Sequence, residues 1–117
     1  MKVGFKHALN GIFLMGKSEK NVRIHFVLFL LVVYAGFFFQ LSKLEWIAVL
    51  LCSAMVFCLE MVNSALEKIC DKITTEKDMD IKWIKDVAAG AVLVAALFSF
   101  IISILIFAPY FYLLLWS

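Results

Sequence analysis

The chain has 117 residues, of which 65% are hydrophobic and 17% are charged, and its formal net charge at pH 7 is +2. Soluble domains average about 45–50% apolar and about 25% charged residues. This composition excludes an ordinary soluble protein and predicts a single integral membrane domain over residues 1–117. The basic residues do not gather on one polar face among exposed aromatic side chains, so we expect no nucleic-acid partner.

The N-terminal segment, residues 1–22, places apolar side chains at helical spacing and most of its lysines on the opposite side. This pattern predicts an amphipathic helix that lies on the membrane surface. Periodicity alone favours a simple anchor over a helix that walls a site. Glu19 and Arg23 are four residues apart and can form an ion pair.

Three apolar segments follow, at residues 24–41, 45–69 and 87–107. Each is long enough to cross a hydrocarbon core of ~30 Å as a helix that rises ~1.5 Å per residue. The first connection is so short that the first two helices must run antiparallel. Pro109 is expected to end the third helix and to leave residues 110–117 at the far interface. The predicted fold is therefore all-α, with one surface helix and three transmembrane helices.

The distribution of positive charge predicts how these helices are oriented. Of the 11 lysine and arginine residues, only Lys43 lies in the first connection, and the others belong to the N-terminal segment or lie around the second connection. Segments rich in lysine and arginine stay in the cytoplasm. We therefore expect a multi-pass protein with a cytoplasmic N-terminus and an external C-terminus.

A stripe of polar residues interrupts the second apolar segment. Glu60, Asn63 and Glu67 recur at helical spacing and face the same way, and Asp71 extends the stripe by one turn. Because an ionisable group inside a membrane span costs about 2.5–3.5 kcal/mol by insertion scales, the stripe indicates a function. We expect Glu60 to lie within the membrane, and Glu67 and Asp71 to lie at or just beyond the interface.

The predicted topology brings Glu19, Glu76, Lys85 and Asp86 to the same cytoplasmic surface. Carboxylates beside a lysine suit a divalent cation and a phosphate, and phosphoryl transfer depends mainly on positioning and charge neutralisation. A partly desolvated Glu60 can take a proton from the attacking hydroxyl of a lipid alcohol. A lipid kinase is therefore one hypothesis, although the sequence has neither a Walker A motif nor a kinase-type glycine loop.

Two other kinds of protein share such a stripe. One is a small oligomeric proton-coupled transporter in which Glu60 carries the proton, and the other is a structural subunit whose polar stripe specifies helix packing. Transport does not explain why Glu19, Glu67 and Lys85 gather at one face, and packing alone does not need carboxylates at two depths. Three helices enclose a site poorly, so we also expect a homo-oligomer.

Four motifs link this sequence to a known family. They are Glu60-x-x-Asn63-Ser64-Ala65-x-Glu67 with Asp71, Lys85-Asp86 at the start of the last span, Phe5-x-x-Ala8-x-x-Gly11, and Glu19-x-x-x-Arg23. Over nearly its whole length the sequence resembles the prokaryotic diacylglycerol kinases, small bacterial membrane kinases that are closely related to undecaprenol kinases. The resemblance implies a homotrimer in the bacterial cytoplasmic membrane that uses ATP and Mg²⁺.

The resemblance also implies a role for each residue of the motifs. Glu60 would accept the proton of the lipid hydroxyl, while Glu19 and Glu67 would hold the metal ion that bridges the ATP phosphates. Asn63 would support the site. The residues implied in nucleotide contacts are Lys85, Asp86, Glu76, Lys77 and Asp78, and those implied in lipid contacts are the surface helix, Arg23 and the region of Ala89.

Two histidines depart from the pattern of the family's best-known branch, which has an acidic residue in place of His25 and an aromatic residue in place of His7. The spacing Glu19-x-Asn21-x-Arg23-x-His25 looks more like the branch that includes undecaprenol kinases. We interpret His25 as an interfacial residue. The acceptor stays open between diacylglycerol, which gives phosphatidic acid, and undecaprenol, which gives undecaprenyl phosphate.

Overall fold

Four helices make up the computed structural model, which describes residues 2–117. They are α1 (Lys2–Ser18), α2 (Lys20–Phe39), α3 (Lys43–Ile73) and α4 (Met79–Trp116). The last three are each long and apolar enough to cross a membrane. The predicted all-α fold with three candidate spans is therefore confirmed.

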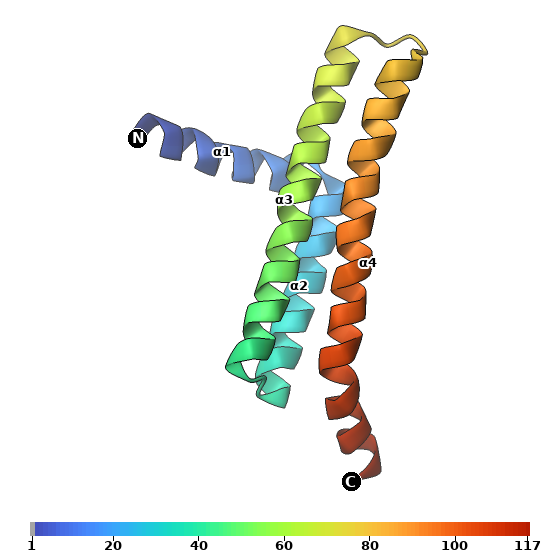
Figure 1. Ribbon diagram of the computed structural model, residues 1–117. Coiled ribbons are helices and arrows are strands. Elements are labelled where there is room, and N and C mark those ends of the chain that lie inside the picture. The colour runs from blue at the N-terminus through green and yellow to red at the C-terminus, as the bar shows by residue number, and fades with distance from the viewer. Residues whose placement is uncertain (1) are drawn as a thin grey trace.

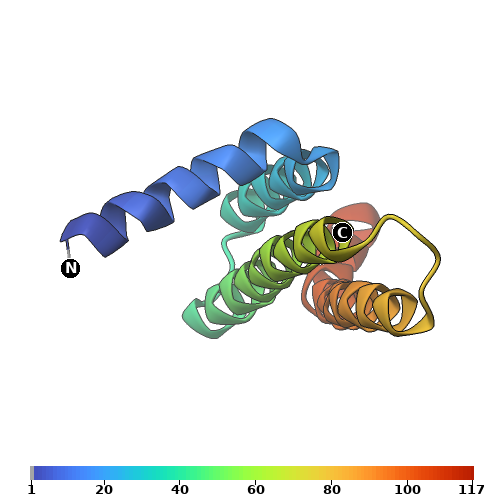
Figure 2. The ribbon, with the colours of Figure 1, turned by 90° about the horizontal axis from the view of Figure 1, so that it is seen from above.

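The three long helices run side by side, whereas α1 runs across them and projects away from the bundle (Figures 1 and 2). Its apolar side chains, among them Phe5, Leu9, Ile12 and Phe13, are exposed. This arrangement is the one that a helix lying on a membrane surface requires. The helix ends at Ser18, four residues before the predicted boundary, because α2 already begins at Lys20.

The break between α1 and α2 is made by one extended residue and one arginine. Glu19 has φ −111° and ψ 114° and forms the N-cap position of α2. The Arg23 guanidinium donates hydrogen bonds to the backbone carbonyls of Lys17 (2.9 Å) and Gly16 (3.4 Å). The last carbonyls of a helix lack partners within the helix, so Arg23 satisfies the end of α1. The predicted ion pair between Glu19 and Arg23 is not formed.

A tight turn joins α2 to α3. Gln40 adopts the left-handed conformation (φ 55°), and Ser42 and Glu45 form a reciprocal capping box at the start of α3. The Trp46 ring packs directly against Gly36, where a Cβ atom would lie 2.6 Å from a ring carbon. This close approach fixes the antiparallel pairing of α2 and α3 that the short connection predicts.

Helix α4 returns along α3 and continues through Pro109 to Trp116. The prediction that Pro109 ends the helix is wrong. Proline removes one backbone donor, and membrane helices tolerate that loss where local adjustments and neighbouring groups satisfy the freed carbonyl. Residues 110–116 therefore extend the last helix rather than forming a separate tail.

Both α3 and α4 are longer than a bilayer core. Their 31 and 38 residues correspond to about 46 and 57 Å at ~1.5 Å per residue, against a core of ~30 Å. Their connected ends stand clear of α1 (Figure 1). Residues of α3 beyond the level of the α1–α2 junction therefore lie outside the three-helix part of the bundle.

The buried apolar core lies at the end of the bundle away from α1. Leu41, Val49, Ile106 and Phe107 form one cluster, and the partly buried rings of Phe39, Trp46 and Tyr110 pack against it. Most other large apolar side chains are exposed on the outer faces of the helices. A surface this apolar fits contact with lipid or with another protein chain rather than with water.

Candidate functional site

The buried polar residues of the described chain are Glu60 and Asn63, which are 5% and 8% exposed. They lie one turn apart on α3 and face the same way, as the stripe predicts. A buried charge or amide without a partner is unfavourable. The surroundings of these two side chains therefore define the candidate site.

Glu60 meets a side chain from a different helix. His25 of α2 places Nε2 at 3.8 Å from the Glu60 Oε2 atom, and the two side chains are 27% and 7% exposed. His25 therefore also lies against the polar stripe, while its interpretation as an interfacial residue stays a prediction. The sequence contains a signal for this contact. In an antiparallel hairpin, residues about equally far from the turn at Gln40 lie at similar heights, and His25 and Glu60 come close to meeting that condition.

Asn63 is satisfied on one side only. Its Nδ2 donates a hydrogen bond of 3.3 Å to Glu67 Oε1, whereas its buried Oδ1 has no hydrogen-bond partner among the described residues. Glu67 is half-buried. An unpaired amide oxygen beside a carboxylate is the kind of hard oxygen donor set that Mg²⁺ prefers. These residues therefore fit a magnesium ion by chemistry.

The charged ends of α3 and α4 are joined by an ion pair. Lys85 Nζ of α4 lies 2.6 Å from Asp71 Oδ1 of α3. On α4 itself, Lys82 Nζ lies 2.6 Å from Asp86 Oδ2. The predicted nucleotide-contacting residues Lys85 and Asp86 are thus each engaged by a protein side chain, and a ligand at Lys85 has to compete with Asp71.

The turn between α3 and α4 holds the remaining predicted nucleotide contacts. Glu76, Lys77 and Asp78 are exposed. Asp78 Oδ1 accepts hydrogen bonds from the backbone N–H groups of Asp80 (2.9 Å) and Ile81 (3.0 Å), so its carboxylate caps α4. The Asp78 side chain therefore has a structural task that the sequence prediction did not include.

Three of the predicted site residues make no described contact with Glu60, Asn63 or Glu67. Glu19 is half-buried at the α1–α2 junction, and its side chain makes no capping hydrogen bond. Arg23 is committed to the end of α1, and Ala89 is exposed on α4. Across residues 4–117, no three side chains of the histidine, cysteine, aspartate and glutamate types gather closely enough to hold a metal ion. The structure therefore does not join Glu19 and Glu67 in one complete site.

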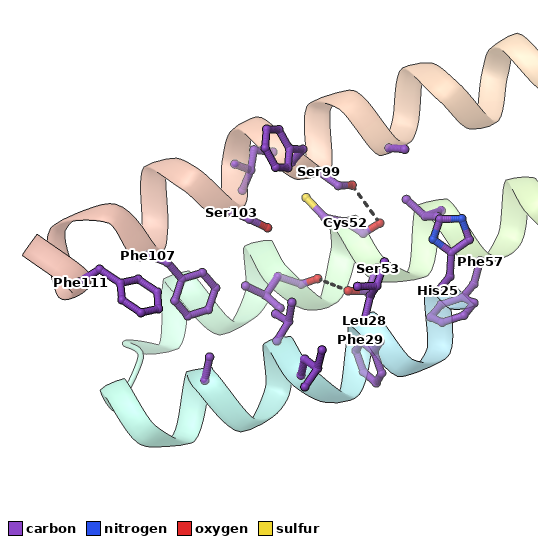
Figure 3. A pocket seen from close by; sticks show the side chains of 18 residues that line it. His25, Leu28, Phe29, Cys52, Ser53, Phe57, Ser99, Ser103, Phe107 and Phe111 are labelled. Carbon is purple, nitrogen blue, oxygen red and sulfur yellow. Dashed lines mark hydrogen bonds between the residues drawn. The ribbon is translucent and has the colours of Figure 1, made fainter. Parts of the chain in front are cut away.

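An apolar groove of ≈ 450 Å³ opens between α2, α3 and α4, with His25 at one end and Phe107 and Phe111 toward the other (Figure 3). Two serines in its wall bond to backbone carbonyls: Ser53 to Val49 (2.9 Å) and Ser99 to Cys52 (3.4 Å). Their hydroxyls are thus partly satisfied within α3 and between α4 and α3. The lining is mostly apolar, which suits a hydrocarbon chain.

Comparison with known proteins points to one family. The sequence matches the family described as prokaryotic diacylglycerol kinase over residues 6–107. It is 40% identical over 105 residues to an undecaprenol kinase from Bacillus subtilis, a match that covers 90% of this chain and 85% of the relative. It is 32% identical over 102 residues to a diacylglycerol kinase from Synechocystis sp., covering 86% of this chain and 58% of the relative.

These matches confirm the kinase hypothesis over the transporter and the structural subunit. Kinases of this family act on a membrane lipid, and family membership implies ATP as the phosphoryl donor. The three long apolar helices agree with a multi-pass membrane protein. The chain belongs to the prokaryotic diacylglycerol kinase family and is a membrane lipid kinase.

Proposed function

We propose that this kinase phosphorylates undecaprenol in preference to diacylglycerol. The observation that carries the choice is the longer and closer match to the undecaprenol kinase from Bacillus subtilis, at 40% identity over 85% of that protein. The match to the diacylglycerol kinase from Synechocystis sp. is 32% identical and spans 58% of it. The product of the proposed reaction is undecaprenyl phosphate.

Glu60 is the proposed proton acceptor. The residue is 5% exposed and lies at the level where α2 begins to pack on α3, next to the apolar groove. The hydroxyl proton of the lipid passes to Glu60 as the hydroxyl oxygen forms a bond to the γ-phosphorus of ATP. The bond from that phosphorus to the bridging oxygen breaks, and ADP leaves.

Glu19 and Glu67 are the residues that we propose to hold Mg²⁺. Glu67 offers a half-buried carboxylate beside the unpaired Asn63 Oδ1. Magnesium sites commonly use one or two carboxylates with phosphate and water oxygens, so two glutamates are enough protein ligands. When bound, the ion would neutralise charge on the β- and γ-phosphates. Asn63 keeps the Glu67 side chain oriented toward the stripe.

The nucleotide site that we propose lies along the α3–α4 turn and the first turns of α4. Lys85 would contact phosphate once it leaves Asp71, and Asp86 would contact the nucleotide from the next position. Glu76, Lys77 and Asp78 are exposed in the turn, where a nucleotide can reach them from water. On the lipid side, Arg23 and Ala89 would border the headgroup region.

A homotrimer with its N-terminus in the cytoplasm is the proposed assembly. Large apolar side chains cover the outer faces of α2, α3 and α4, and a second copy could cover part of that surface. Such an assembly would also allow Glu19 of one copy to approach Glu67 of another. The concentration of lysine and arginine around the N-terminal segment and the second connection supports the cytoplasmic orientation.

The experiment that tests the proposal compares two acceptors in detergent micelles. Purified protein is supplied with Mg²⁺, ATP labelled at the γ-phosphate, and either undecaprenol or diacylglycerol at equal mole fraction. We expect a ratio of kcat/KM values that favours undecaprenol about tenfold or more, which is ~1.4 kcal/mol of discrimination. Equal rates, or faster transfer to diacylglycerol, would reject the preference.

The same assay tests the metal ligands. Glu67→Gln keeps the hydrogen bond to Asn63 within reach but removes the charge. We expect the Mg²⁺ concentration for half-maximal rate to rise about tenfold, equivalent to ~1.4 kcal/mol of binding. An unchanged Mg²⁺ dependence would remove Glu67 from the proposed metal site without touching the choice of lipid.

A further inference from the structure

His25 supplies the cross-helix polar contact of Glu60. Its Nε2 lies 3.8 Å from Glu60 Oε2, and among the charged pairs of the described chain this one reaches the buried carboxylate. Figure 3 shows His25 at one end of the apolar groove, beside Phe57. The imidazole therefore lies at the point where the groove meets the proposed proton acceptor.

The neighbour one turn along α3 is already committed elsewhere. Asn63 Nδ2 donates to Glu67 Oε1, so that amide points along the stripe toward Glu67. A carboxylate rotates broadly about its last torsion when nothing holds it. A proton acceptor, however, has to lie about 2.6–3.2 Å from the hydroxyl oxygen in a defined direction. Something other than Asn63 has to orient Glu60.

We propose that His25 is the positioning residue of Glu60. The imidazole Nε2–H donates to Oε2, which turns Oε1 toward the acceptor hydroxyl. This inference rests on the proposed role of Glu60 as proton acceptor.

The distance between His25 Nε2 and Glu60 Oε2 fits a pair that tightens during the reaction. A separation of 3.8 Å is about 0.6 Å beyond the usual range for an N–H···O hydrogen bond. Such contacts in ligand-free enzymes are often long and shorten when the substrate is bound. A lysine in this place would fix a permanent charge beside Glu60, whereas imidazole can donate a hydrogen bond in its neutral form. The pair can therefore hold the carboxylate without neutralising it permanently.

The test replaces His25 in the purified enzyme and follows kcat and KM separately. In His25→Ala we expect kcat to fall about 10- to 100-fold, as it does when a residue that orients a metal ligand is replaced. The KM for ATP should stay within about twofold. Adding imidazole should restore part of the lost kcat in His25→Ala. It should not restore kcat in His25→Phe, where a ring fills the space, or in Glu60→Gln.

Two further variants complete the test. His25→Gln keeps an N–H donor of similar reach and should retain most of the kcat that His25→Ala loses. Leu44→Ala, which shortens an exposed side chain in the first turn of α3, at the opposite end of the bundle, is the control and should behave like the parent protein. Thermal unfolding in the same detergent shows whether each variant is folded.

Three results would overturn the proposal. They are a kcat for His25→Ala within about threefold of the parent, a loss that imidazole and His25→Gln both fail to recover, and a loss expressed as a raised KM for ATP together with a lower unfolding temperature. The last result assigns His25 to packing alone. Failure of the parent protein to phosphorylate either lipid is a different outcome, because it rejects the proposed function and not the role of one histidine.

Discussion

Two glutamates of α3, Glu45 in its first turn and Glu60 in its middle, differ in how their carboxylates are bound. Glu45 Oε1 accepts hydrogen bonds from the Ser42 backbone N–H (2.9 Å) and from the Tyr110 hydroxyl of α4 (2.6 Å). Glu60 is more deeply buried, yet the nearest ionisable side chain among the described residues, His25, stays 3.8 Å away. A carboxylate engaged by strong donors serves the fold, and one left almost free in a dry site is available for chemistry.

The same contrast separates the two ends of the bundle. At the Glu45 end, Phe39 lies with its ring centroid 5.5 Å from that of Tyr110 and 4.9 Å from that of Phe111, so aromatic rings close the space between helices. The apolar groove leads from these rings to His25 at the Glu60 end, where a buried amide oxygen has no partner among the described residues. Stability is concentrated at the first end and unsatisfied polar groups at the second, as expected when a site is built on a rigid support.

The largest effect that this comparison predicts belongs to Glu60→Gln. Removing the proton acceptor should lower kcat about 10³-fold, or ~4 kcal/mol, within the range for general base catalysis. The unfolding temperature should stay close to that of the parent, because glutamine has nearly the same size and shape as glutamate. Phosphate transfer from labelled ATP and nucleotide binding, measured on the same preparation, separate these effects.

Two outcomes for Glu60→Gln would contradict this prediction. A rate within tenfold of the parent would exclude Glu60 as the proton acceptor, since general bases contribute about 10²–10⁴-fold. Loss of nucleotide binding in Glu60→Gln would instead assign this carboxylate to the nucleotide site.

Much of the fold could be predicted from the sequence because composition and local pattern determine it. The apolar segments lie within α2, α3 and α4 apart from the residues beside the turn, and the polar stripe Glu60–Asn63 is buried on one face of α3. The end of α4 could not be predicted in the same way. A proline usually ends a helix in water. Pro109 is tolerated here because the freed carbonyl of a membrane helix can be satisfied locally.

The candidate site could be predicted from the sequence only where its residues lie on the same helix. Periodicity within one helix places Glu60, Asn63 and Glu67 together, but it says nothing about contacts between helices. The contact from His25 depends on the register of the hairpin, which the turn at Gln40 sets. The use of Arg23 as a cap for α1 depends on where that helix ends. The roles assigned to Glu19 and Lys85 stay predictions, because they involve bound ligands and the proposed neighbouring copies.

Gly36→Ala disturbs the packing of α2 on α3 at the aromatic end of the bundle, away from Glu60. The added Cβ would meet the Trp46 ring at 2.6 Å, and an aromatic ring packed between helices cannot swing away freely. We expect a loss of about 2 kcal/mol in the free energy of unfolding, as for overpacked cores. Unfolding in a detergent titration measures it.

The activity of folded Gly36→Ala should stay close to that of the parent. Gly90→Ala is the matched control, because nothing lies within 4 Å of a Cβ at Gly90. Equal stability of the two alanine variants would show that the Trp46 contact does not restrict the spacing of α2 and α3.

Tyr110→Phe tests the structural glutamate directly. The change removes the hydroxyl that donates to Glu45 Oε1 and keeps the ring against Phe39. We expect a small loss of stability, because the backbone N–H of Ser42 still holds Glu45. Stability should fall while the rate per folded molecule stays unchanged. A drop in kcat with unchanged stability would mean that the two ends of the bundle are coupled.

The smallest effect concerns a pair that has to open for nucleotide binding. The ion pair between Lys85 and Asp71 is partly exposed, with side chains 38% and 63% accessible, and such pairs contribute about 0–1 kcal/mol to stability. Asp71→Asn should therefore leave the unfolding temperature nearly unchanged. It should also lower the KM for ATP about two- to threefold, because Lys85 no longer has to leave a carboxylate to reach a phosphate, and a pair this weak cannot oppose binding by more. The gain should shrink as salt is raised, since salt screens the competing pair in the parent. A higher KM in Asp71→Asn would contradict this competition and would indicate that Asp71 helps to bind the nucleotide or its metal ion.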